Sequence, residues 1–329
     1  MISEKENYKM LLRGEVPEFI PRYRMMEWMV MPSLFMDLKS PDGYKMDEFG
    51  VELTTTSASM GAHMPVPGRV LLKDIRKWRD VIKAPDISDV DWAALAEKDL
   101  AKKDPANNPV VISAGGYFMT LMNFMTFTEG LCAMYEEPEE VYALFEYLSE
   151  YYLEKQRALT KYYNPDVYCI ADDTAAWQFP FISEKMYREL VYPFHRKHAE
   201  MALDDGLFVT MHDCGKCETF IDDWVEMGVS AWEPAQVSND LVAIKKKYGR
   251  RLAIMGGWDN TGRISFADQV SDEELREALY KYVDTLAPNA GFAFLAMMNG
   301  SQEDEEVKRK SAIIEDVYQN YAKSYYKTH

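Results

Sequence analysis

Short apolar runs alternate with longer amphipathic segments along this chain, and this alternation constrains the fold more than any other feature. Seven of the runs have the length and composition of strands. They lie at residues 20–25, 110–113, 166–171, 207–211, 229–232, 252–255 and 292–297. They are apolar along most of their length, which is typical of parallel strands that are buried on both faces. The alternation therefore predicts βαβ units and a parallel sheet.

Helical patterns lie between most of these runs and after the last one. The clearest segments are residues 137–162, 184–203, 272–286 and 303–326. Ser183 and Ser271 are expected to cap the second and third of them, and Glu274 would complete a capping box with Ser271. Ser301 precedes the fourth segment, which suits either an outer helix or a contact in a homodimer.

An eight-stranded barrel needs one strand more than the seven runs supply. We expect the missing strand between residues 258 and 290, a stretch that otherwise has helical character. Residues 31–85 do not follow the alternation, and we predict that they form an insertion of a hairpin and short helices over one mouth of the barrel. No linker-like stretch divides the chain, so residues 1–329 are expected to form a single domain.

Charge and hydropathy limit the partners of the chain. It has 54 Asp and Glu against 37 Lys and Arg, a net charge of −17, and a phosphate backbone would be repelled by such a surface. No stretch approaches 18 uncharged apolar residues, and the first residues do not resemble a signal peptide. We therefore expect a cytoplasmic protein, monomeric or homodimeric, that binds neither nucleic acid nor a membrane.

The fourth apolar run ends in a segment that contains potential metal ligands. His212 and Cys214 are two residues apart, so both side chains point to one side if the chain is still extended. Imidazole and thiolate are zinc ligands, and Gly215 would permit a tight turn after them. Chance loop residues are the alternative, but the whole chain has five His and four Cys, and three of them fall within six positions. We therefore predict a metal site at His212 and Cys214. The other cysteines, Cys132 and Cys169, are expected to be buried thiols.

Carboxylates follow two other apolar runs, where the active sites of barrel enzymes collect. Asp172 and Asp173 follow the third run, and neighbouring residues of an extended chain point in opposite directions. One of them is expected to act in the site while the other caps or binds backbone. Glu233 ends the fifth run and is a candidate metal ligand or general base. A salt-bridged carboxylate at the barrel rim is the alternative for Glu233.

Aromatic and polar residues near the predicted strand ends could line a substrate pocket. The candidates are Tyr117, Trp177, Phe181, Trp258 and Asn299. Core packing is the alternative for aromatic residues of this kind. Gly256 and Gly257 end the sixth run, where they would permit close approach of the backbone to a ligand. Motifs for binding dinucleotides or the phosphates of nucleotides are absent from the sequence.

Several short motifs resemble, in order and spacing, those of one enzyme superfamily. They are D-E-F-G-V at 47–51, F-I-S-E-K-M-Y-R at 181–188, H-D-C-G-K at 212–216, W-E-P-A-Q at 232–236 and G-G-W-D at 256–259. Together they resemble the uroporphyrinogen-decarboxylase superfamily. The resemblance implies a (β/α)8 barrel of the TIM type with the inserted segment after its first strand.

The superfamily has two main branches, and the resemblance favours the corrinoid-linked methyltransferases. The decarboxylases carry an arginine-rich loop after the first strand, whereas this chain has only Arg22 and Arg24, followed by Met25, Met26 and Glu27. The corrinoid-linked branch takes zinc through a His-x-Cys motif, which this chain shares. Many of its members also use a cysteine near the end of the last strand. The corresponding segment here, residues 295–300, contains none.

The missing cysteine leaves the third zinc ligand open between Glu233, Cys217 and Asp173. It also makes thiol methylation a poorer fit than demethylation. The resemblance then implies an O-demethylase methyltransferase that moves a methyl group from a small methylated donor, an aromatic methyl ether, to a corrinoid (cobalamin) on a partner protein. The zinc would polarise the ether oxygen. The alternatives are a tetrapyrrole decarboxylase that uses Arg22 and Arg24, and a noncatalytic module that binds a corrinoid protein.

Overall fold

A six-stranded parallel sheet forms the centre of the molecule. The computed structural model describes residues 2–55, 63–301 and 303–329. The strands are hydrogen-bonded in the order β4-β5-β6-β7-β8-β9. Their bounds are Val111–Ile112 for β4, Val167–Ala171 for β5, Phe208–His212 for β6, Val229–Ala235 for β7, Ala253–Gly256 for β8 and Phe292–Ala293 for β9. All neighbours are parallel. Six of the seven predicted strands and the parallel sheet are therefore confirmed.

Residues 22–29 approach both edges of this sheet. Arg22 forms a parallel bridge with Phe294 beyond β9, and Met29 forms one with Val111 of β4. The backbone of Tyr23 donates to Phe294 and that of Val30 donates to Val111. The predicted first strand at 20–25 is thus an isolated bridge, because the chain turns into the short helix α2, Met25–Trp28, directly after it.

The predicted position of the missing strand is wrong. Within residues 258–290 the structure has two 3-10 turns, Arg263–Ser265 and Ala267–Gln269, followed by helix α12, Asp272–Leu286. An isolated bridge between Phe266 and Asn299 is the only β pairing of that stretch among the described residues. The apolar residues there serve the helix rather than a strand.

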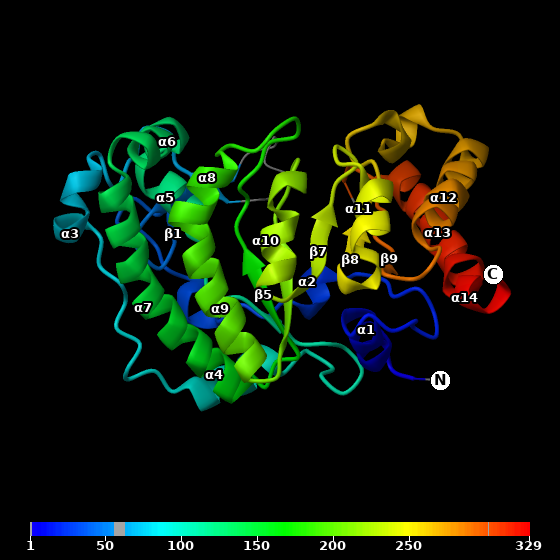
Figure 1. Ribbon diagram of the computed structural model, residues 1–329, viewed down its shortest axis with the longest axis horizontal. Helices are drawn as coiled ribbons and strands as arrows, with labels where there is room; N and C mark the ends of the chain where they lie inside the picture. The colour runs from blue at the N-terminus through cyan, green and yellow to red at the C-terminus, as the bar shows by residue number, and fades with distance from the viewer. Residues whose placement is uncertain (1, 56–62, 302) are drawn as a thin grey trace.

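Helices lie on both sides of the sheet in Figure 1, with α7 and α9 on one side and α12 and α13 on the other. The predicted helices at 137–162 and 272–286 are confirmed as α7, Pro138–Tyr163, and α12, Asp272–Leu286. The predicted helix at 184–203 is helical throughout but divided into α8, Glu184–Met186, the π-helical turn Tyr187–Val191 and α9, Tyr192–Asp204. The last predicted helix, 303–326, ends earlier, because α13 covers only Glu305–Asn320. The remaining helices are α1 Glu4–Leu12, α3 Trp78–Val81, α4 Trp92–Leu100, α5 Phe118–Met125, α6 Phe127–Glu136, α10 Ile221–Glu226, α11 Leu241–Tyr248 and α14 Tyr325–Thr328.

Side-chain caps begin several of these helices. Ser183 accepts from the backbone of Met186, and Ser271 forms the predicted capping box with Glu274. The last long helix has Asp304 as its N-cap residue, whose side chain accepts from the backbone of Glu306. A carboxylate at this position also interacts favourably with the positive end of the helix dipole.

The segment 31–85, which the sequence predicts to be an insertion, contains an antiparallel sheet of its own. Its strands are β1 Lys45–Met46, β2 Glu52–Thr54 and β3 Met64–Pro65. Phe49 packs against Phe124 of α5, and Glu48 forms a half-buried ion pair with Lys155 of α7. These contacts fix the described part of the insertion against α5 and α7. The Ser- and Thr-rich run that the sequence places within it lies mostly at 56–62, outside the described residues.

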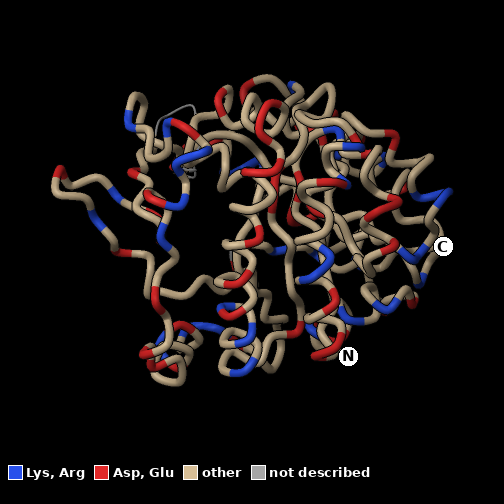
Figure 2. Tube along the Cα trace, turned by 60° about the vertical axis from the view of Figure 1, so that its left-hand side comes forward, with Lys and Arg blue, Asp and Glu red and all other residues tan. Residues whose placement is uncertain are grey.

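Charged residues of both signs are interspersed in the view of Figure 2. Many of them are paired along helix surfaces, as Arg276 is with Asp316. Such exposed pairs contribute little to stability, roughly 0–1 kcal/mol each. Among the described residues, none of the helices combines the length with the apolar composition that a bilayer crossing needs.

Candidate metal centre

The carboxyl ends of β5, β6 and β7 bring the predicted metal-binding residues together. β6 ends at His212, whose partner in register on β7 is Glu233. The loop after β5 starts with Asp172, whose backbone donates to the carbonyl of His212. Parallel strands end at a common edge of the sheet, so residues that are distant in sequence meet there.

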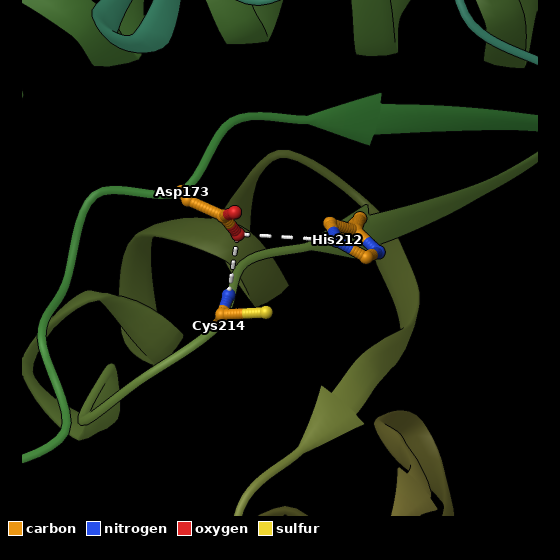
Figure 3. Close-up of side chains that lie close together, drawn as sticks. All are labelled: Asp173, His212 and Cys214. Carbon is orange, nitrogen blue, oxygen red and sulfur yellow. Dashed lines mark hydrogen bonds and ion pairs between the residues drawn. The ribbon is translucent and has the colours of Figure 1, made fainter. Parts of the chain in front are cut away.

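Asp173, His212 and Cys214 form a group that could hold a metal ion. One ligand atom from each residue lies within 4.8 Å of the others. Figure 3 shows the Asp173 carboxylate directed between the His212 ring and the backbone of Cys214. Imidazole, thiolate and carboxylate are all zinc donors, and three protein ligands leave a fourth position for a substrate. The donor set of these residues thus fits zinc.

The two ring nitrogens of His212 face different carboxylates. Nδ1 lies 2.8 Å from Oε2 of Glu233, and Nε2 lies 3.9 Å from Oδ1 of Asp173. Glu233 is 1% exposed, so it is shielded from water and fixed in position. A buried carboxylate on one nitrogen orients the ring and leaves the other nitrogen free to bind a metal. Burial lowers the pKa of His212, but the charge of Glu233 and hydrogen bonds outweigh it and raise the pKa well above its usual value.

Cys214 is half-buried, and its loop has a fixed backbone. Burial raises the pKa of its thiol, so a bound metal would have to displace the thiol proton. The backbone N–H of Cys214 donates to Asp173 at 2.8 Å. Gly215 follows at φ +92°, and a Cβ there would lie 2.5 Å from the carbonyl oxygen of Ala175. The tight turn that the sequence predicts at Gly215 is therefore present, and it permits close packing of the two loops.

Asp172 points away from this group. It is 2% exposed, and its carboxylate accepts from the backbone N–H groups of Tyr117, Phe118 and Met119 at the start of α5. Its Oδ2 also lies 3.0 Å from Nε2 of His195. These contacts satisfy the carboxylate and the free end of the helix. The structure thus places Asp172 as a cap and Asp173 beside the potential ligands.

Sequence reasoning missed two side chains that fix the loop after β6. Asp213 is 1% exposed and accepts from the backbone and hydroxyl of Thr174. Asn239 accepts from the backbone of Cys217 and donates to the carbonyl of Gly215. The signal for Asp213 was its position between His212 and Cys214, which turns its side chain to the opposite face. No local pattern marks Asn239, because its contacts are distant in sequence.

A cavity of about 730 Å³ adjoins the site. His212 and Glu233 are in its wall, so the centre opens into a space large enough for a small molecule. The other lining residues come from the segment 22–27, from the end of β7, from the loops after β8 and β9, and from α13: Arg22, Tyr23, Arg24, Met25, Glu27, Pro234, Asn260, Leu295, Ala296, Met297 and Glu315. Arg22 pairs with Glu315, and Arg24 with Glu27.

The predicted pocket residues are dispersed, and none of the five lines this cavity. Tyr117 is fully buried and contacts His198, and Phe181 stacks on the ring of Phe118. Trp258 is buried and donates to Ser265. The last two are Trp177, which is 39% exposed, and Asn299, which donates to the carbonyl of Asn260 behind the cavity wall.

The two glycines at the end of β8 permit close packing of neighbouring segments of the chain. A Cβ on Gly256 would lie 2.7 Å from the backbone of Ala235, and one on Gly257 would lie 2.3 Å from Leu286. The close approach expected there is therefore between β8, β7 and α12.

The remaining cysteines differ in exposure. Cys169 is buried as predicted and donates to Glu233. Cys132 is exposed, so its predicted burial is wrong. Cys132 lies on the solvent-exposed face of α6. Cys217 is buried, and it lies outside the Asp173–His212–Cys214 group.

Comparisons with known proteins agree with this architecture. Residues 45–294 match the uroporphyrinogen decarboxylase (URO-D) family, so the chain belongs to that family. Among solved structures, a methyltransferase from Methanosarcina mazei is similar over 97% of this chain and 100% of its own, with a TM-score of 0.59 and 13% identity. At that identity the likeness concerns the fold. A search of curated proteins finds no match.

Proposed function

We propose that this chain is a zinc-dependent methyltransferase of the corrinoid-linked kind. Its donor would be a small methyl ether, preferably aromatic, and the acceptor would be the cobalt of a corrinoid carried by a partner protein. The observation that supports this proposal most directly is the Asp173–His212–Cys214 group beside a cavity of about 730 Å³. The fold shared with a methyltransferase of Methanosarcina mazei is a second support.

Each residue of the site has a separate role in this proposal. Nε2 of His212, the thiolate of Cys214 and the carboxylate of Asp173 would hold the zinc. Glu233 would keep His212 in the required orientation and tautomer. When bound, zinc supplies Lewis acidity to the ether oxygen, which makes the phenolate a better leaving group.

The cavity wall would hold the rest of the donor. Met25, Leu295 and Met297 offer apolar and polarisable surface for a ring. We further propose that the segment 22–29 closes the sheet into a barrel, since it bridges both of its edges. The partner would then approach the carboxyl ends of the strands, where the cavity opens.

One observation favours a second candidate, a decarboxylase acting on a tetrapyrrole with carboxylate side chains. Arg22 and Arg24 line the cavity and could bind such carboxylates. Both guanidinium groups, however, already pair with Glu315 and Glu27. A polycarboxylate would have to displace these acidic residues, which makes this candidate the weaker one.

The test is methyl transfer from 2-methoxyphenol to free cob(I)alamin, followed through the absorbance of methylcobalamin. We expect transfer by the zinc-loaded chain and none by His212→Ala. Full activity of His212→Ala would contradict the proposal. Loss of uroporphyrinogen carboxyl groups in a zinc-free reaction, abolished by Arg22→Ala, would establish the decarboxylase instead.

A further inference from the structure

The residue that the proposed zinc site leaves unused is Cys217. It follows Cys214 by three positions, and the intervening Gly215 and Lys216 complete a Cys-x-x-Cys sequence. Its side chain turns back toward the backbone of this loop, since Sγ lies 3.2 Å from the carbonyl oxygen of Cys214 and 3.5 Å from that of Asp213. Cys-x-x-Cys pairs are typical of reversible thiol chemistry.

Three side chains hold the backbone around this pair through four hydrogen bonds. Asp173 accepts from the N–H of Cys214, and the side chain of Gln236 accepts from that of Gly215. Asn239 fixes the N–H of Cys217 and the carbonyl of Gly215. The two cysteines are therefore held in one fixed loop, with the side chain of Cys217 in contact with the backbone of Cys214.

The two thiols differ in access to the surroundings. Cys214 is half-buried beside the cavity residue His212, whereas Cys217 is fully buried beneath the loop. A partly exposed thiol with a protected thiol next to it is the arrangement of a reactive cysteine and its resolving partner, and the thiolate form of Cys214, which reacts with peroxide, is also the form that zinc would bind. A sulfur that enters a disulfide also loses the negative charge with which it would bind zinc.

We propose that Cys214 and Cys217 form a disulfide when hydrogen peroxide reaches the site, and that this bond removes Cys214 from the zinc centre. The second half of this inference rests on the proposed function. In the first step the Cys214 thiolate attacks one peroxide oxygen. The O–O bond breaks, an S–O bond forms and hydroxide leaves, so the sulfur is oxidised to a sulfenic acid while peroxide is reduced.

In the second step the Cys217 thiol attacks the sulfenic sulfur. The S–S bond forms, the S–O bond breaks, and the hydroxyl group leaves with the thiol proton as water. A dithiol reductant would reverse the disulfide and restore both thiols. The switch thus disarms the centre reversibly and protects Cys214 from irreversible oxidation.

The test treats the zinc-loaded chain with a small excess of hydrogen peroxide. We expect free thiols to fall from four to two, zinc to be released in step as followed with a colorimetric chelator, and a peptide map to join Cys214 to Cys217. Dithiothreitol and fresh zinc should restore the starting state. Cys132→Ser, which lacks the exposed thiol on α6, should behave in the same way apart from one thiol fewer.

Two variants make the assignment specific. Cys217→Ser and Cys217→Ala should bind zinc, form no such disulfide, and accumulate a sulfenic acid at Cys214 that dimedone labels. Four intact thiols after treatment, or a map without this disulfide, would each overturn the inference. A chain that takes up no zinc would refute the proposed function instead, and the thiol count and peptide map would still decide the disulfide.

Discussion

Asp172 and Asp173 are consecutive residues, yet they belong to two different polar clusters. Asp172 joins His195 and the start of α5 in a cluster that is almost free of solvent, to which His198 and its partners on α7 also belong. Asp173 joins His212 and Cys214 at a cavity. In the first cluster the Asp172 carboxylate is held by three backbone N–H groups and by His195. In the second, three potential metal ligands face one another beside a cavity, with Nε2 of His212 3.9 Å from Asp173. The mutual arrangement of the donor atoms, rather than the residue types, distinguishes a candidate reactive site from a structural network.

The largest expected effect is on zinc binding by the second cluster, which consists of Asp173, His212 and Cys214. We expect the double variant His212→Ala/Cys214→Ala to lose the metal entirely, because two of three ligands are gone. Metal content after dialysis, with circular dichroism to confirm folding, provides the measurement. Cys132→Ala is the matched control and should retain its zinc. Stoichiometric zinc in the double variant would place the metal elsewhere.

The adjacent aspartates allow a direct contrast between the two clusters. Asp172→Ala should lower the free energy of unfolding by about 3–5 kcal/mol, since it leaves buried N–H groups of α5 without an acceptor. Asp173→Ala should cost less than about 1 kcal/mol, because its side chain is partly exposed. It should instead weaken zinc binding at least about tenfold.

Urea unfolding and a competitive zinc titration of both variants measure this contrast. Equal losses of stability in the two variants would show that both carboxylates are structural. Loss of zinc in Asp172→Ala with its stability unchanged would reverse the assignment.

Glu233 contacts the side of His212 that faces away from Asp173, and its substitution should have an intermediate effect on zinc affinity. Glu233→Gln keeps the size of the side chain but removes the charge that faces Nδ1 of His212. We expect zinc affinity to fall about 10- to 100-fold in a chelator competition. Glu315→Gln, in the wall of the same cavity, is the control and should leave the affinity unchanged. An unchanged affinity in Glu233→Gln would mean that the ring is held without it.

The smallest effect concerns the pH dependence of stability that arises from His198 in the first cluster, that of Asp172 and His195. Burial, followed by the charges of His195 and Lys197, lowers the pKa of His198 from 6.5 to about 3. Between these values the unfolded chain takes up a proton that the folded chain cannot, so the stability falls as the pH falls. The loss is about 1.4 kcal/mol per pH unit, or about 2 kcal/mol from pH 6.5 to pH 5.

Urea unfolding at pH 7 and pH 5 tests this dependence against a His198→Gln variant. That variant should be less stable at pH 7, because it loses contacts with Tyr117 and Tyr168. It should also lose less stability on acidification than the unmodified chain. If the stabilities of the two chains changed with pH in the same way, His198 would take up its proton as readily in the folded state as in the unfolded state.

Periodicity predicted what local sequence controls. Six parallel strands, the long helices and the capping box of Ser271 and Glu274 all follow from apolar spacing and short-range hydrogen bonds. The predicted strand at 20–25 is reduced to one bridge, because helix α2 begins at Met25. An apolar run of that length does not distinguish a strand from a buried turn. The exposure of Cys132 also depends on which face of α6 packs against the core, and the identity of one residue does not indicate that face.

By itself the sequence determined that two potential zinc ligands stand at the end of a strand, two residues apart, with acids at the ends of neighbouring strands. Only the tertiary structure decided which acid faces them, that Glu233 contacts the far nitrogen of His212, and which side chains form the cavity wall. Side-chain alternation specifies that Asp172 and Asp173 diverge, but their partners at the start of α5 and in the loop after β6 come from segments some 40 to 55 residues away. Such contacts are set by the packing of the whole sheet, and a local pattern contains no information about them.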